Sequence, residues 1–205
     1  MLERARTAVV QARFLSQPYH VAVANPPYMG SKNMDARLAA FAKETYPDAK
    51  GDLMTMFMKR CDSLVSPGGW WGMINLPSWM SLSTFAELRD WLLSGSSIDT
   101  LVHFGRGVFG SDFASVGFVI EKAQAGEGRR GVYRRLFNEH VEVRSNAVIE
   151  SHFLDPEFQR FEIPQRELLR VPGTPIAYWL SDAIRKAMQS PTTFRSNFAP
   201  KKGND

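Results

Sequence analysis

Four consecutive residues have the types and the order that could hold a planar amine. Asn25, Pro26, Pro27 and Tyr28, here called the corner, follow a short apolar run over residues 19–24. The two prolines fix two φ angles and push the preceding residue into an extended conformation, so Asn25 is presented rigidly. The Asn25 side-chain oxygen and the Pro26 carbonyl offer two acceptors for the two hydrogens of an amino group. Tyr28 adds a flat face for stacking.

This arrangement fits the transfer of a methyl group to an amino nitrogen. Two hydrogen bonds accepted from the amine orient its lone pair toward an electrophilic methyl group, so no strong base is needed. The rate then comes from placing the nucleophile and the methyl donor in line, in a pocket that is poor in water. An Asn-Pro pair is also a common turn opener, so the corner by itself fits an ordinary loop equally well.

The elements that must position the corner alternate between strands and helices. In chain order, the apolar spacing predicts a helix, a strand, two helices, a strand, a helix and two strands, at residues 1–17, 19–24, 35–44, 52–64, 70–76, 84–95, 98–104 and 116–121. The run at 70–76 is apolar throughout, as in a strand covered on both faces. This alternation predicts an α/β fold with a largely parallel sheet, whose ligands lie beyond the carboxyl ends of the strands.

The rest of the chain is less regular. After residue 123 the pattern predicts a Gly-containing turn, an edge strand over 132–137 and a last helix over 174–188, with no long periodicity over 141–172. The tail has the composition of a disordered segment. We therefore divide the chain into a catalytic domain, a small irregular appendage and a disordered tail, at residues 1–123, 124–188 and 189–205.

Composition narrows the class of protein. The single cysteine, Cys61, can form neither an intramolecular disulfide nor a Cys-based zinc site, which fits a reducing cytoplasm. No stretch approaches the ~18 to 20 apolar residues of a membrane span. The four histidines have no partners at ligand spacing, so we expect no metal site. A net charge of +4 permits contact with a polyanion without requiring it.

Motifs after the corner resemble those of a known family. A Gly-Asp-Leu sequence at 51–53 opens a predicted helix, Pro-Gly-Gly-Trp at 67–70 leads into a strand, and Pro-Ser-Trp at 77–79 follows that strand. This order resembles the catalytic half of methyltransferases that act on N6 of DNA adenine. A more specific resemblance, over about residues 5–188, is to the adenine-specific methyltransferases of the phage-exclusion systems called BREX or Pgl. It rests on the segments 24–31, 101–105 and 175–181.

The resemblance implies a partial Rossmann-like methyltransferase sheet, S-adenosylmethionine as the methyl donor and double-stranded DNA as the partner. All four residues of the corner would be catalytic, with Asn25 and Pro26 holding the amine of an extruded adenine and Tyr28 stacking on its ring. Phe109 would be a candidate for the other face of the base. Asp52 matches a position beside the cofactor pocket, although an acidic residue at a helix N-terminus is as readily structural.

The donor side of the chain departs from this family. Family members place a Gly-rich donor-binding turn and an acidic ribose ligand upstream of the corner, and only 24 residues precede it here. The later Gly-Arg-Gly at 105–107 follows the wrong strand and has no helix after it. We therefore expect a fragment that lacks the donor-binding half and is inactive alone.

Two other functions stay open. The chain could be a non-enzymatic remnant, or a subunit of a split enzyme, that binds DNA or a partner chain. The unpaired edge of the strand at 19–24 would then pair with a complementing N-terminal half or with a second copy. The corner would also suit an amino-methyltransferase for protein or RNA, and the downstream motifs favour DNA.

Overall fold

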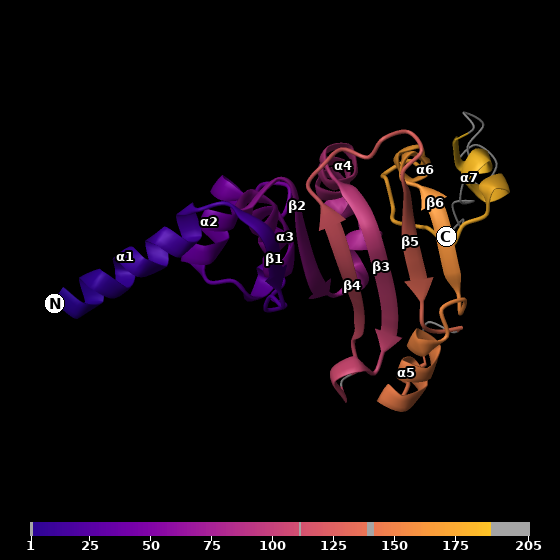
Figure 1. Cartoon of the computed structure of the whole chain (residues 1–205), viewed down its shortest axis with the longest axis horizontal. Helices are drawn as coiled ribbons and strands as arrows, with labels where there is room; N and C mark the ends of the chain where they lie inside the picture. The colour runs from indigo at the N-terminus through magenta and orange to yellow at the C-terminus, as the bar shows by residue number, and fades with distance from the viewer. Residues whose placement is uncertain (1, 111, 139–141, 190–205) are drawn as a thin grey trace, which may run out of the picture.

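The strands of the protein lie side by side in one sheet (Figure 1), in a computed structural model that describes residues 2–110, 112–138 and 142–189. The sheet has six strands in the order β1-β2-β4-β3-β5-β6. The strands are β1 Tyr19–Ala24, β2 Val65–Asn75, β3 Ser97–Arg106, β4 Ala114–Glu121, β5 Arg130–Arg135 and β6 Arg160–Pro164. The helices are α1 Leu2–Ser16, α2 Ala36–Thr45, α3 Leu53–Leu64, α4 Ala86–Gly95, α5 Asn146–Leu154, α6 Arg166–Leu169 and α7 Asp182–Gln189. The predicted α/β class is therefore confirmed.

Parallel and antiparallel pairs both occur in this sheet. The parallel arrangement that the sequence predicted holds for β1–β2 and β3–β5. The three pairs that β4 and β6 form, with β2, β3 and β5, are antiparallel. The physical reason lies in the connections: helices α2 and α3 carry the chain over from β1 to β2, whereas β3 and β4 are joined directly and pair as a hairpin.

One face of the sheet carries the main core. Trp71 of β2 and Phe118 of β4 are buried on this face and belong to the same apolar cluster as side chains of α3 and α4. On the opposite face of β1, Val21 and Val23 are 59% and 80% exposed. We call this surface of β1, β2 and β4 the open face. Within the described residues, the expectation that the strand at 70–76 is covered on both faces is therefore wrong.

Helix α1 projects away from the sheet at one end of the molecule (Figure 1). None of its described residues is buried, and Phe14 is 60% exposed. A hydrogen bond from Arg60 to the carbonyl of Leu15, at 2.8 Å, ties its last turn to α3. Because most helices in proteins owe their stability to packing of an apolar face, α1 gains little of the usual stabilisation.

The segment before α7 differs from the sequence prediction. A helix was predicted over 174–188, whereas α7 forms only the second half of that range. The Ile176 amide donates to the carbonyl of Met80 at 2.8 Å, and both Ile176 and Tyr178 are buried. These long-range contacts hold residues 173–181 as an irregular segment, which we call the strap. The prediction of helix there is wrong because burial against another part of the chain overrides local spacing.

The remaining C-terminal elements were not visible in the sequence. Helix α5 and strand β6 lie in the range 141–172, where no periodicity was found. The strand predicted over 132–137 forms as β5, but the expectation that it lies at the edge of the sheet is wrong, because β6 pairs with it on the side away from β3. The division of the chain at residue 123 stays a prediction. Apart from Gln189, which ends α7, the tail predicted to be disordered lies outside the described residues.

Three further observations concern the classes weighed from composition. The described helices include none with both the length and the apolar character that a membrane span requires. In the described ranges, no three His, Cys, Asp or Glu side chains gather where they could hold a metal ion. Cys61 is buried in α3, and burial raises the pKa of its thiol to about 11, so it acts as a packing residue.

Candidate functional site

The corner follows the last residue of β1, at the edge of the sheet where β2 and β3 also end. Pro26 is buried and Asn25 is exposed, so the Asn25 side chain projects from an anchored backbone. A hollow of about 480 Å³ lies beside Asn25, along Val23 and Ile74 of the open face. Among the described residues, neither the Asn25 side chain nor the Pro26 carbonyl has a hydrogen-bond partner. Both acceptors are therefore free to meet a ligand.

The ring of Tyr28 is held in place from two sides. Its hydroxyl donates to the carbonyl of Ile74 in β2 at 3.1 Å. Its ring meets Phe113 edge to face, with the centroids 5.8 Å apart and the planes at 84°. The side chain is half-buried, and this burial raises the pKa of the phenol. The orientation of the ring is thus set by the end of β2 and by the loop between β3 and β4.

Asp52 joins the first turn of α3 to the residue that follows the corner. Its Oδ1 accepts from the Met54 amide at 3.0 Å, which caps the helix, and from the Met29 amide at 3.1 Å. The Leu53 amide donates in turn to the Met29 carbonyl at 2.9 Å. Asp52 therefore positions the corner through these backbone groups. The further role beside a cofactor, which the resemblance implies, stays a prediction.

The aromatic side chain that the structure brings to Tyr28 is Phe113. Phe109 lies on the same β3–β4 loop and is 56% exposed. Its φ of +65° is a left-handed conformation, which is uncommon for a residue other than glycine. Its role on the second face of a base stays a prediction. The loop was recognised from the sequence, but which of its phenylalanines meets Tyr28 depends on how the hairpin closes.

A second hollow opens at the same edge of the sheet and was missed by the sequence analysis. It has a volume of about 530 Å³ and is lined by Leu76 and Pro77 after β2, by His103 of β3, and by Phe113 and Trp179. A smaller hollow of about 240 Å³, which also has His103 and Trp179 in its wall, extends it toward β5. We call the two together the Trp179 groove. Trp179 belongs to the strap, whose path the sequence did not predict.

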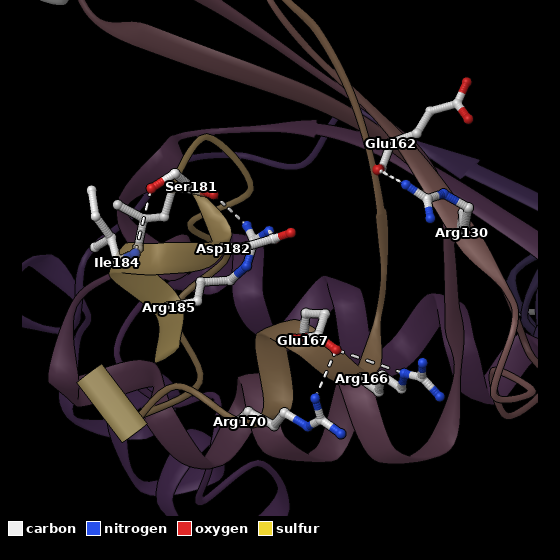
Figure 2. A network of polar contacts seen from close by, with 10 residues as sticks. Arg130, Glu162, Arg166, Glu167, Arg170, Ser181, Asp182, Ile184 and Arg185 are labelled. Carbon is white, nitrogen blue, oxygen red and sulfur yellow. Dashed lines mark hydrogen bonds and ion pairs between the residues drawn. The ribbon is translucent and has the colours of Figure 1, made fainter. Parts of the chain in front are cut away.

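Arginines are numerous near β5, β6 and the C-terminal helices, and the protein itself uses most of them. Figure 2 shows Arg130 donating to the carbonyl of Glu162, and Arg166 and Arg170 pairing with Glu167. On the neighbouring strand edge, Arg129 pairs with both Asp99 and Glu121, at 3.0 and 3.1 Å. These internal partners make this side a mixed-charge surface, so it offers no strong argument for a phosphate site.

The model of the Eco57I restriction-modification methylase family matches residues 3–109, about half of the chain. The chain belongs to this methylase family. The matched range contains the corner, Asp52 and Phe109.

Two curated proteins carry the resemblance further. The adenine-specific methyltransferase BrxX of Escherichia coli O9:H4 (strain HS) is 36% identical over 181 residues, which are 86% of this chain and 14% of that protein. The adenine-specific methyltransferase PglX of Lacticaseibacillus casei (strain Zhang) is 33% identical over 189 residues, 90% of this chain and 16% of that protein. The resemblance to the BREX and Pgl methyltransferases is thereby confirmed. The chain spans only about a seventh of the length of these relatives.

A solved structure supports the fold. The methyltransferase subunit of a type I restriction-modification system from Streptococcus thermophilus superposes with a TM-score of 0.51 at 10% identity. The match covers 80% of this chain and 38% of that one. At this identity the likeness concerns the fold alone, and it agrees with a partial methyltransferase sheet.

Proposed function

We propose that this chain forms the adenine-holding part of an S-adenosylmethionine-dependent N6-adenine DNA methyltransferase. The observation that carries the proposal is the exposed Asn25 side chain, which stands on the buried Pro26 and close in sequence to the pinned ring of Tyr28. Membership of a restriction-modification methylase family supports the reaction class. The two relatives that are named adenine-specific methyltransferases support the choice of base.

In this mechanism the corner binds and orients the amine. The Asn25 oxygen and the Pro26 carbonyl accept the two N6 hydrogens, so the nitrogen lone pair points away from the protein backbone. The Tyr28 ring covers one face of the adenine and excludes water from it. Because both acceptors stand on a proline-stiffened backbone, little ordering is needed when the base arrives.

S-adenosylmethionine would supply the methyl group. Met1 to Ala24 contain no Gly-rich turn of the kind that binds this donor, and the Asp52 Oδ1 atom is engaged by two backbone amides. These residues do not make up a donor site, so we derive no step through the donor. We propose that donor contacts come from a segment other than residues 1–205.

The open face and the free edge of β1 are the surface that such a segment would use. Among the described strands β1 pairs only with β2, and Val21 and Val23 beside its free edge are exposed. An unpaired edge next to an apolar surface favours addition of another strand. We propose a complementing methyltransferase segment as the partner. The alternative partner is a second copy of this chain. Size-exclusion chromatography with light scattering tests it, because self-association requires that the fraction of dimer rises with protein concentration.

The test of the proposed function is a chimera that joins this chain to the rest of a relative. The chain replaces the 181 matched residues of the Escherichia coli relative, and methyl transfer from radiolabelled S-adenosylmethionine to duplex DNA is measured. We expect label on adenine N6. Asn25→Ala should lower the rate about 100-fold or more, because the amine loses its orientation. Asn25→Asp should retain activity, because a carboxylate offers the same acceptors.

The control variant is Asn33→Ala, which changes an exposed asparagine a few residues after the corner. It should leave the rate unchanged. Equal rates for the two alanine variants would remove the role assigned to Asn25. RNA and a protein mixture are offered as substrates beside the DNA, and label in either of them instead of DNA would contradict the proposed substrate.

A further inference from the structure

We propose that the Trp179 groove binds a nucleobase of the substrate strand next to the methylated adenine, with Trp179 as its stacking residue. This inference rests on the proposed function, since it assumes a DNA strand at the corner. It adds a second base site on residues outside the corner.

The groove begins where the adenine site ends. Phe113 forms part of its wall and also meets the ring of Tyr28, at 5.8 Å between centroids. From there the groove passes His103 of β3 and reaches Arg135, the last residue of β5, and Asn138. It therefore runs past the carboxyl ends of β2, β3 and β5, with the start of β4 between the first two, along the edge at which α/β proteins bind ligands. A strand held at Tyr28 can continue along it.

Trp179 is exposed in a way that packing does not explain. It is 40% exposed, whereas Ile176 and Tyr178 on the same strap are buried. Its indole is braced edge to face against Tyr178, with the centroids 5.0 Å apart and the planes at 86°. A large aromatic ring that packs against a buried neighbour and is partly exposed to solvent is preorganised for stacking, because little side-chain entropy is lost on binding.

The strap that carries Trp179 is fixed to the opposite wall of the groove. Arg89 of α4 is buried, and its guanidinium donates to the Gly173 carbonyl at 2.7 Å and to the Trp79 carbonyl at 2.8 Å. The Ile176 amide bonds the Met80 carbonyl at 2.8 Å. Strap and wall therefore form one rigid unit. The width of the groove is set before a ligand arrives.

The lining suits a flat heteroaromatic ring. The walls near Trp179 are mainly apolar, with Leu76, Met80 and Phe113, and two serines, Ser78 and Ser81, also line them. A volume of about 530 Å³ is in the range of small-ligand sites. Apolar walls with an aromatic face and a few polar groups are the usual means of holding an unstacked base. At the far end, Arg135 and Asn138 add polar groups to the lining.

The experiment uses the 205-residue chain and a labelled single strand of twelve nucleotides, whose bases are accessible without unpairing. Fluorescence anisotropy measures the dissociation constant. Trp179→Ala should weaken binding about tenfold or more, and Trp179→Phe should restore most of the affinity, as expected for base stacking. Phe41→Ala is the matched control: Phe41 is 49% exposed on α2, outside the groove, and its loss should change nothing.

Direct contact is read by photocrosslinking to a strand that contains 5-iodouracil. We expect the crosslink to map to residue 179 in the parent chain and in the Asn25→Ala variant. Absence of binding by the parent chain, equal affinity of the Trp179→Ala variant, or equal binding of a strand without bases would overturn the inference. If residue 179 crosslinks but Asn25→Ala leaves the methyl-transfer rate of the chimera unchanged, only the proposed function fails. If Asn25→Ala lowers the rate of the chimera but residue 179 does not crosslink, only the base site in the Trp179 groove is refuted.

Discussion

The corner and the strap reach the same edge of the sheet, but different forces hold them there. The corner is stiffened by its own prolines and by Asp52, which accepts from the backbone amides of Met29, just after the corner, and of Met54 in α3. The strap is held by Arg89 and by the Ile176 amide, through bonds to residues about 85 to 95 positions away along the chain. One edge of the sheet therefore combines a locally encoded part with a part that exists only after the chain has folded.

The strap should be the easier of the two to break. Arg89 makes five hydrogen bonds to the carbonyls of Trp79, Leu82, Gly173 and Thr174. Arg89→Ala leaves these acceptors unsatisfied, so the free energy of unfolding should fall by about 3 kcal/mol or more, measured by urea denaturation. Arg166→Ala, which removes an exposed ion pair, should cost less than about 0.5 kcal/mol. Equal losses would contradict the role of Arg89.

The corner should respond less to loss of its anchor. Asp52→Ala removes the cap of α3 and the bond to the Met29 amide, and we expect a loss of about 2 kcal/mol. Asp35→Ala is the matched control, because Asp35 caps α2 through the Leu38 amide at 2.7 Å. It should cost about 1 kcal/mol. Both losses are measured by denaturant unfolding. The amount by which the loss for Asp52→Ala exceeds that for Asp35→Ala estimates the contribution of the bond to the Met29 amide, and equal losses would refute that contribution.

Two tyrosines give the finest comparison of the regions. Tyr28→Phe removes a hydrogen bond to β2 and should cost about 1 kcal/mol at neutral pH, measured by thermal unfolding. Tyr178→Phe should cost almost nothing, because the buried Tyr178 hydroxyl has no partner among the described residues. A larger loss of unfolding free energy for Tyr178→Phe than for Tyr28→Phe would contradict the conclusion that only the Tyr28 hydroxyl makes a stabilising hydrogen bond.

Alkaline pH extends the same comparison. Burial raises the pKa of both the Tyr28 and the Tyr178 phenols above the unfolded value of about 10. The neutral phenols therefore favour the folded state, and this stability is complete below about pH 10 and declines as the pH rises further. Because Tyr178 is the more deeply buried, Tyr178→Phe should flatten the decline more than Tyr28→Phe. Identical profiles of unfolding free energy against pH would contradict this.

Local features of the fold were predictable from residue types. The predicted helix at 52–64 differs from α3 by one residue, because its apolar face repeats at helical spacing and Asp52 is a good cap. The strand at 19–24 and the helix at 35–44 were also close, since each lies between clear end signals. The helix predicted over 84–95 begins two residues later as α4, after Phe85, which makes no side-chain capping bond.

The candidate site was predictable only in part. The corner stands at a strand end, as expected from its prolines. Phe113 and Trp179 could not be assigned, because their positions depend on how the β3–β4 hairpin closes and where the strap is tied. The sequence offered two phenylalanines on one loop and a helix-like pattern in the strap. No local signal distinguishes these alternatives, since bonds between distant residues decide between them.

The place of the corner at a strand end, the α/β class and the family resemblance could be obtained from residue types and their order alone. The first two depend on dihedral restriction by proline, on capping and on apolar spacing, which act over a few residues, and the resemblance depends on the order of short motifs. The insertion of β4 between β2 and β3, the open face and the groove under Trp179 were decided only in three dimensions. Each depends on which distant segments compete for the same buried surface, and burial outweighs local preference where the two disagree.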